Sequence, residues 1–286
     1  MNPGKIEEKE KYRQVGWFER AAESIGKSLG QGWLRAKLRA FYHQLLLLRS
    51  GGRGFRCDLP GGESVRILPA YRFASWSTVE YNAFREAVRP GDLVLDIGAN
   101  VGAYSLLFGQ WTGPAGKVFA FEPAPETFIA LCRHTQMNHL EGIVLPQCLA
   151  ISDRAATLEF AADRFHGTNR LRSTTESGDG KSAIIQVQAM TIDEFCAQNN
   201  LQPDFIKIDI EGFELAALVG ARKTISAGRG KLALFVEMHP AIWENIGVSR
   251  REIMEELDRQ GLRAEPLVDG EGDPWAAGVC LRLIYK

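Results

Sequence analysis

From Glu80 onward, short apolar segments typical of strands alternate with longer segments typical of helices. Five strands are predicted, at 93–97, 117–121, 143–147, 205–210 and 232–237, and helix-length segments separate most of them. Such alternation is typical of a parallel sheet covered by helices on both faces. Two last apolar segments, 262–268 and 278–286, flank a turn-rich stretch and are candidates for an antiparallel pair at the end of the sheet. The sequence therefore predicts an α/β fold.

The segments that precede and interrupt this pattern differ in character. Residues 17–48 carry apolar side chains at helical spacing with basic side chains between them, which predicts an amphipathic basic helix that either packs on the body or docks on a membrane surface or a partner. Two alternating runs around residues 60–62 predict a β-hairpin. An insertion follows the third strand, with strand-like 156–160 and 183–190 flanking a polar stretch, 163–182, that we expect to be a lid or a disordered loop. We divide the chain into a helical arm (1–50), a hairpin extension (51–79) and a main domain (80–286).

The charge is unevenly distributed along the 286 residues, which carry 34 Lys and Arg against 35 Asp and Glu. Residues 1–50 contain ten basic and five acidic residues, a net charge of +5, and the other 24 basic and 30 acidic residues give the remainder −6. Such a body has no overall attraction to nucleic acid, and we expect no nucleic-acid partner. Five widely spaced cysteines without a CxxC pair favour buried thiols over a zinc site. The N-terminus has no signal-peptide pattern and no apolar run has the length of a bilayer span, so we expect a cytoplasmic protein.

A glycine turn follows the first predicted strand at residues 96–102 (DIGANVG) and leads into a helix beginning near Val101. Glycines allow a tight turn and close approach of a ligand. In the dinucleotide fingerprint G-x-G-x-x-G, the second glycine lets the backbone approach a pyrophosphate and the third lets the helix pack closely on the strand. In this chain those two positions hold Asn100 and Ala103. The carboxylate of Asp96 would repel a pyrophosphate but suits an ammonium or sulfonium charge. The turn therefore favours a cationic, nucleotide-type ligand.

Glu122 ends the second strand, 24 residues after Gly98. At this spacing an acidic side chain can accept hydrogen bonds from both hydroxyls of a ribose. Because open α/β sheets bind ligands at the carboxyl ends of their strands, we expect Asp96 and Glu122 to border one ligand site.

The fourth strand carries two carboxylates at its carboxyl end, Asp209 and Glu211, which alternation places on the same side. A hydroxyl nucleophile needs an aligned approach and a group that takes its proton, and Asp209 is placed for either role. The alternative is that Asp209 caps the following helix and Glu211 is a solvated turn residue. Glu214, in the first turn of that helix, is expected to stabilise the helix dipole.

The fifth strand ends with Glu237 and His239 on one side. A neutral imidazole accepts a proton near pH 7 more readily than an ordinary carboxylate, so His239 is the preferred base. The other four histidines are expected to be surface or core residues. The spacing of Asp209, Glu211, Glu237 and His239 also allows a divalent metal site without requiring one, and the prediction is catalysis without a metal.

Three segments together, 96–102 (DIGANVG), 121–123 (FEP) and 206–214 (IKIDIEGFE), resemble the FkbM family of S-adenosylmethionine-dependent methyltransferases. The similarity covers roughly residues 80–260, and the I-D-I-E-G-x-E pattern is its most specific part. The resemblance implies a Rossmann-like class I methyltransferase fold with a mostly parallel seven-stranded sheet. It also implies S-adenosyl-L-methionine as cofactor and O-methylation of a hydroxyl, often on a sugar or polyketide.

The resemblance assigns cofactor contacts to Glu80, to the ribose-binding acid Glu122, and to four residues of the glycine turn, namely Asp96, Gly98, Asn100 and Gly102. The expected catalytic residues are Asp209, His239 and Glu211, with a sugar, glycan or similar polar metabolite as acceptor. Two other functions remain open. A nicotinamide-dependent oxidoreductase would share the fold, although Asn100 and Ala103 and the lack of a Tyr-xxx-Lys pair count against it. A cofactor-binding module without activity is the other.

Overall fold

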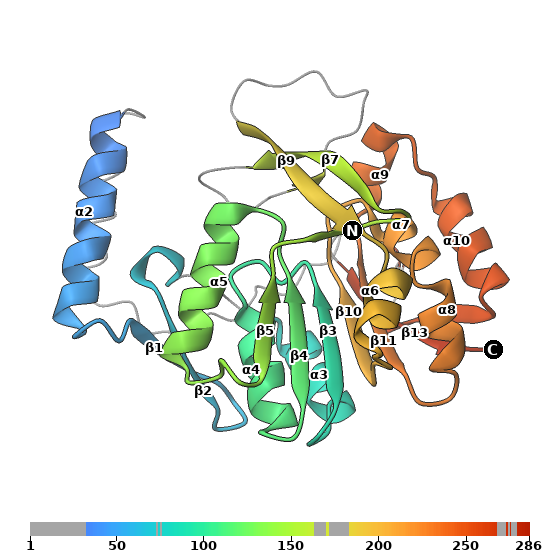
Figure 1. The fold of residues 1–286 in the computed structure, drawn as a ribbon, viewed down its shortest axis with the longest axis horizontal. Helices are drawn as coiled ribbons and strands as arrows, with labels where there is room; N and C mark the ends of the chain where they lie inside the picture. Colours follow the sequence, from blue (N-terminus) through green and yellow to red (C-terminus); the bar gives the residue numbers. More distant parts are fainter. Residues whose placement is uncertain are drawn as a thin grey trace, which may run out of the picture.

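A seven-stranded sheet forms the centre of the protein in a computed structural model that describes residues 33–72, 74, 76–162, 170–171, 183–267, 273, 275 and 279–286 (Figure 1). Its spatial order is β12-β13-β11-β10-β3-β4-β5. The strands are β3 (Leu93–Ile97), β4 (Lys117–Phe121), β5 (Val144–Gln147), β10 (Phe205–Ile208), β11 (Ala233–Met238), β12 (Leu262–Pro266) and β13 (Val279–Tyr285). Only β13 in this sheet runs antiparallel to its neighbours, β11 and β12. The predicted α/β fold, including the antiparallel C-terminal pair, is confirmed.

Helices cover both faces of this sheet because its strands are apolar on both sides. One face packs against α3 (Thr78–Ala87), α4 (Ala103–Thr112) and α5 (Pro125–Met137). The other packs against α6 (Ile192–Asn199), α7 (Glu214–Val219), α8 (Arg222–Ala227), α9 (Pro240–Ile246) and α10 (Arg250–Arg259). Within β3, Val94 lies in the first core while Leu95 and Ile97 lie in the second, as strand alternation requires. Asp96 therefore points to the α4 face.

The insertion after β5 forms a second, four-stranded sheet in the order β6-β9-β7-β8. Its strands are β6 (Ala150–Ile151), β7 (Ala156–Ala162), β8 (Arg170–Leu171) and β9 (Ala183–Met190). The two predicted strand segments are thus confirmed, and they pair antiparallel. Apart from β8, the polar stretch 163–182 lies outside the described residues. Its expected role as a lid or a disordered loop therefore stays a prediction.

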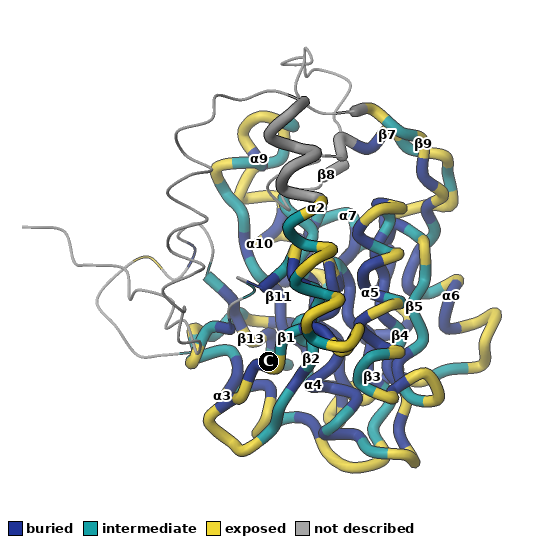
Figure 2. Tube along the Cα trace, turned by 90° about the vertical axis from the view of Figure 1, so that its left-hand side faces the viewer, coloured by how far each residue is buried: buried dark blue, intermediate teal, exposed yellow. Residues whose placement is uncertain are grey.

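The N-terminal elements are α2 (Trp33–Arg49), the hairpin strands β1 (Phe55–Asp58) and β2 (Ser64–Ile67), and the short 3-10 helix η1 (Pro69–Tyr71). The hairpin was predicted, whereas the first half of the predicted helix, 17–32, lies outside the described residues. Along α2, Phe41 is 62% and Leu45 is 47% exposed, while His43 contacts the buried Arg72 at 3.1 Å. The described side chains of α2 alternate between intermediate and exposed (Figure 2). Across the described part of the chain, no helix combines the length and apolar character that crossing a bilayer demands.

Candidate active site

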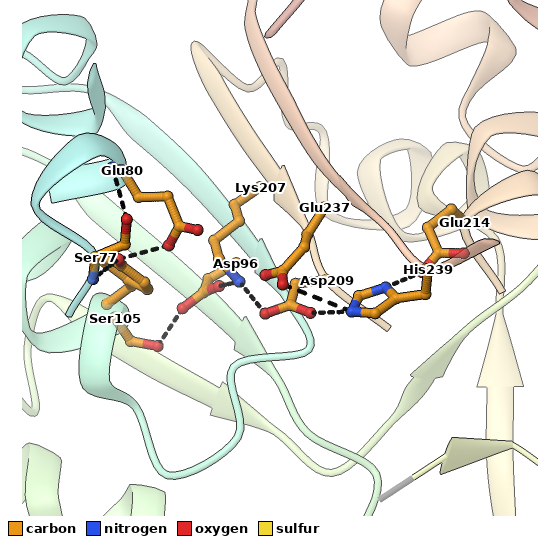
Figure 3. Close-up of polar contacts among 10 residues, drawn as sticks. Ser77, Glu80, Asp96, Ser105, Lys207, Asp209, Glu214, Glu237 and His239 are labelled. Atoms are coloured by element: carbon orange, nitrogen blue, oxygen red, sulfur yellow. Dashed lines mark hydrogen bonds and ion pairs between the residues drawn. The ribbon is translucent and has the colours of Figure 1, made fainter. Parts of the chain in front are cut away.

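A row of charged side chains crosses the carboxyl ends of three adjacent strands, β3, β10 and β11 (Figure 3). Lys207 of β10 pairs in register with Asp96 of β3, and strand alternation turns both toward the α4 face. Asp209 directly follows β10, Glu237 lies near the end of β11, and His239 follows β11. The parallel register therefore assembles these groups from distant parts of the sequence.

Lys207 is the buried cation of this row, and its side chain is 4% exposed. Its Nζ lies 3.0 Å from Oδ2 of Asp209 and 3.9 Å from Oδ1 of Asp96. Burial disfavours the ammonium, but Asp209, Asp96 and Glu237 outweigh it and hold the pKa of Lys207 above its ordinary value. Lys207 was not among the site residues predicted from the sequence, although a lysine in a strand of otherwise apolar residues is a signal for a buried ion pair.

Asp96 is almost fully buried, with the oxygen Oδ2 accepting a hydrogen bond from the Ser105 hydroxyl at 2.6 Å. Its other oxygen, Oδ1, has no hydrogen-bond donor and faces Lys207. Burial raises the pKa of Asp96, against the opposing effects of Lys207 and Ser105. The carboxylate that we expected to face a cationic ligand thus has a cationic partner inside the protein.

His239 is held by Glu214, whose side chain is fully buried. Oε1 of Glu214 lies 2.7 Å from Nδ1 of His239 and accepts the backbone N–H of Gly212, and its Oε2 accepts the indole N–H of Trp243 at 2.6 Å. A carboxylate in this network is an acceptor, so Nδ1 is the donor and Nε2 points toward Asp209 and Glu237. Glu214 lies in the first turn of α7, as expected, and its carboxylate is in addition engaged with the polar cluster, which was not predicted.

The Nε2 atom of His239 lies 3.8 Å from Oδ1 of Asp209 and 3.6 Å from Oε1 of Glu237. Burial favours the neutral imidazole, but Glu214 and then Asp209 and Glu237 raise the pKa of His239 to about 9. Burial, together with Asp209 and Glu80, raises the pKa of Glu237 to about 7. The pKa of Asp209 lies below its ordinary value, because Lys207 and His239 outweigh its burial.

One ligand atom from each of Asp209, Glu237 and His239 lies within 4.8 Å of the others, and these three residues could hold a metal ion.

A pocket adjoins this cluster at the ends of β3, β4 and β10. Its polar lining includes Gly98, Asn100, Glu122, Asp209 and Glu211. Its apolar lining includes Ile97, Phe121, Leu149, Ile151 and Phe160, the last contributed by the inserted sheet. Asp209 belongs to both the pocket and the charged cluster, so a ligand in the pocket lies beside the acid and base groups.

Glu122 is the buried acid of the pocket. Its Oε1 accepts the backbone N–H of Ala124 at 2.8 Å, and the backbone N–H of Asn100 also donates to the carboxylate. Burial outweighs these hydrogen bonds and raises the pKa of Glu122 to about 7. An acid with apolar surfaces beside it suits a nucleoside, whose hydroxyls can bind the carboxylate while the base contacts the apolar wall.

Gly98 allows the pocket to form, because it has φ +80° and a Cβ there would lie 1.8 Å from the carbonyl oxygen of Asp209. Only glycine permits the backbones after β3 and β10 to approach so closely. Gly102, also at positive φ, precedes α4 and would collide with Leu131 if it carried a Cβ. Gly102 does not line the pocket, and the helix begins at Ala103.

Two other predicted site residues lie at the margins. Glu80, in the first turn of α3, accepts a hydrogen bond from the Tyr104 hydroxyl at 2.6 Å and does not line the pocket. The alternation that placed Glu211 beside Asp209 does not hold, because β10 ends at Ile208 and Glu211 adopts φ +41°. Asp209 and Glu211 nevertheless both line the same pocket. His134, in contrast, is a core histidine, as expected, with Val101 and Leu68 as backbone partners.

Comparison with known proteins identifies relatives of this chain. The profile of the family described as Methyltransferase FkbM domain matches residues 96–264, more than half of the chain. The hexuronic acid methyltransferase AglP of Haloferax volcanii is 23% identical over 158 residues, covering 55% of this chain and 60% of that protein. The 31-O-demethyl-FK506 methyltransferase FkbM of Streptomyces tacrolimicus is 46% identical over 68 residues, covering 24% of this chain and 25% of that protein. The alignments thus cover less than two thirds of either relative.

A crystal structure of the methyltransferase FkbM from Methylobacillus flagellatus KT aligns with a TM-score of 0.42 at 19% identity. That alignment covers 76% of this chain and 53% of the other.

Proposed function

Because the chain belongs to the methyltransferase FkbM domain family, we propose that it transfers a methyl group from S-adenosyl-L-methionine to a hydroxyl. The observation that carries this proposal is the position of Asp209, which lines the same pocket as Glu122 and belongs to the charged cluster with His239 and Glu237. One ligand site and one set of proton acceptors thus meet at a single residue.

Glu122, Gly98 and Asn100 are the residues we assign to the cofactor. The Glu122 carboxylate binds the ribose hydroxyls, the close turn at Gly98 admits the ligand to the strand ends, and the apolar wall that includes Phe160 contacts the adenine. Glu211 borders the same pocket, so we assign it to the cofactor side of the site. When bound, S-adenosyl-L-methionine supplies a methyl group on a positively charged sulfur, and the excess of carboxylates over Lys207 at this edge favours such a charge.

The acceptor hydroxyl lies at the cluster of Asp209, Glu237 and His239 in this proposal. Solvent reaches all three side chains, which are 29%, 17% and 15% exposed, so an acceptor can enter. The hydroxyl loses its proton as the new O–C bond forms, and the carboxylate oxygens of Asp209 and Glu237 are the acceptors that the cluster offers for it. The pKa of about 9 keeps the imidazole of His239 protonated near pH 7, so it offers a donor at Nε2 and is not the neutral base expected from the sequence. Glu214 fixes the imidazole in the orientation that presents Nε2.

The acceptor is proposed to be a sugar, a glycan or a similar polar metabolite. This proposal is supported by the names of two relatives, one a hexuronic acid methyltransferase and the other a 31-O-demethyl-FK506 methyltransferase.

Calorimetry of the purified chain with S-adenosyl-L-methionine tests the proposal directly. We expect binding, and we expect Glu122→Gln to weaken it at least tenfold while the exposed neighbour variant Glu126→Gln leaves it unchanged. Mass spectrometry of activated sugars and glycan fragments incubated with the protein and cofactor should then reveal a product heavier by one methylene. Binding of NAD without binding of S-adenosyl-L-methionine would overturn the proposal in favour of an oxidoreductase.

A further inference from the structure

We propose that Asp209, Glu237 and His239 bind a divalent cation of the Mg²⁺ and Mn²⁺ class. The proposal rests on the proposed function only for the role of the ion, since the site itself is defined by the side chains. The sequence prediction had left this site without a metal, and the geometry of the three residues now argues for one.

The first argument is the spacing of the ligand atoms. Nε2 of His239 lies 3.6 Å from Oε1 of Glu237 and 3.8 Å from Oδ1 of Asp209. Both separations exceed the range of a hydrogen bond. They match two ligands of a common ion, which lie about 3 to 4 Å apart when each is about 2.1 Å from the metal. The three groups converge on a point without bonding to one another through Nε2.

The second, independent argument is the orientation of the imidazole. A histidine that binds a metal through one ring nitrogen usually donates its other N–H to a carboxylate, which fixes the tautomer and the ring plane. Glu214 provides that carboxylate at 2.7 Å from Nδ1, and Gly212 and Trp243 donate to it in turn. Nε2 is thereby directed at the two remaining carboxylates.

The third argument is the charge balance. Four carboxylates, those of Asp96, Asp209, Glu237 and Glu214, lie in and beside the cluster, and the basic groups among them are Lys207 and the imidazole of His239. Lys207 contacts Oδ2 of Asp209, which leaves Oδ1 on the side of His239. A cation at the triangle would separate the carboxylates of Asp209 and Glu237 and compensate the excess negative charge.

Two carboxylates and one imidazole leave coordination positions open, which distinguishes a catalytic site from a closed structural one. In the proposed reaction an ion there would bind the acceptor hydroxyl and acidify it. The O–H bond breaks, the proton passes to solvent, which reaches the cluster, and the O–C bond forms as the methyl group leaves sulfur. With Nε2 deprotonated and bound to the ion, His239 serves as a ligand and not as the base expected from the sequence.

Titration of the EDTA-treated full-length chain with Mn²⁺, followed by electron paramagnetic resonance, tests the site without any turnover. We expect one Mn²⁺ per chain, displaced by excess Mg²⁺, and at least tenfold weaker binding in Glu237→Gln and in His239→Gln. Glu122→Gln, which changes a pocket acid outside the triangle, should bind Mn²⁺ as the unmodified chain does. Circular dichroism of each variant confirms that it is folded.

Binding of S-adenosyl-L-methionine, measured in parallel with and without EDTA, separates the two proposals. Cofactor binding and methyl transfer that persist in EDTA, with no Mn²⁺ bound, would overturn the metal site and leave the methyltransferase proposal standing. Mn²⁺ binding that survives both Glu237→Gln and His239→Gln would place the ion elsewhere and also overturn the site. A chain that binds Mn²⁺ at the triangle but no cofactor would support the site and overturn the proposed function.

Discussion

Lys207 is a charged side chain in a strand whose four residues are all buried. It is stable there because Asp209 and Asp96 neutralise it, and each of these carboxylates depends on it in return. A buried ion pair adds little net stability, but removing one partner leaves the other charge buried and unpaired.

We therefore expect Lys207→Met to lower the free energy of unfolding by about 3 to 5 kcal/mol, as for other broken buried pairs. Urea denaturation measures this change. The exposed Lys223 provides the control, because Lys223→Met should cost less than about 0.5 kcal/mol. Adding Asp96→Asn to Lys207→Met should recover part of the loss, whereas simple additivity of the two changes would contradict the pairing.

Glu122 predicts a pH dependence with a definite sign. Its pKa is 4.5 when unperturbed and about 7 in the folded chain, so folding takes up a proton between these values. Below pH 4.5 the raised pKa of Glu122 does not change the free energy of unfolding. Between pH 4.5 and pH 7 it lowers the free energy of unfolding progressively, and above pH 7 the loss is constant. A shift of this size corresponds to about 3 kcal/mol.

Glu122→Gln should therefore gain stability relative to the unmodified chain as the pH rises, by about 3 kcal/mol between pH 4 and pH 8. Urea unfolding at several pH values gives the difference in stability between the variant and the unmodified chain. A hydrogen bond lost in the variant shifts this difference equally at every pH, so it does not affect how the difference changes with pH. A difference that does not change with pH would show that the carboxyl is charged throughout.

The extent to which the site could be predicted also differs from residue to residue. Asp209 and His239 were identified because each lies at the carboxyl end of a predicted strand, and these strand ends meet at one sheet edge. Lys207 and Glu214 were not, because their partners come from the register between β10 and β3 and from the packing of α7 against β11. Glu211 was misplaced because its turn conformation is not visible in an alternating pattern.

At the scale of elements, the insertion between β5 and α6 contributes to the pocket. Phe160 of β7 is buried and lines it, while Leu158, two residues earlier on the same strand, packs in the same small core without lining it. The strands of this insertion were predictable from their apolar runs. Their pairing into a separate sheet was not, since it depends on contacts between segments far apart in sequence.

Phe160→Ala should weaken binding of S-adenosyl-L-methionine about tenfold or more, because it removes part of the apolar wall. Calorimetry measures the affinity. Leu158→Ala is the matched variant, expected to lose stability through its core contact but to keep the affinity within about twofold. Equal losses of affinity in both would mean that the inserted sheet acts only by supporting the pocket.

At the scale of the whole molecule, the sequence predicted the main sheet well because its strands and helices carry continuous apolar faces. The charge asymmetry between residues 1–50 and the remainder is a property that the main sheet does not explain. We propose that this N-terminal segment is a separate arm, since α2 leaves Phe41, Leu45 and Leu48 exposed.

Deleting residues 1–45 should lower association with anionic phospholipid vesicles or a partner more than it lowers cofactor affinity. Vesicle sedimentation and calorimetry measure the two effects on the same preparation. If the truncated chain lost cofactor binding while still sedimenting with vesicles, the segment would belong to the core instead.

The contacts of Lys207 with both Asp96 and Asp209 connect the strand that leads into the glycine turn with the acceptor cluster. A cofactor bound beside the glycine turn and a ligand bound at the acceptor cluster then both act on the buried charge of Lys207. Thermodynamic reciprocity requires that the factor by which a ligand at the cluster changes cofactor affinity equal the factor by which the cofactor changes that ligand's affinity. Communication through Lys207 would make occupancy of the two subsites cooperative, and its loss would uncouple them equally in both directions.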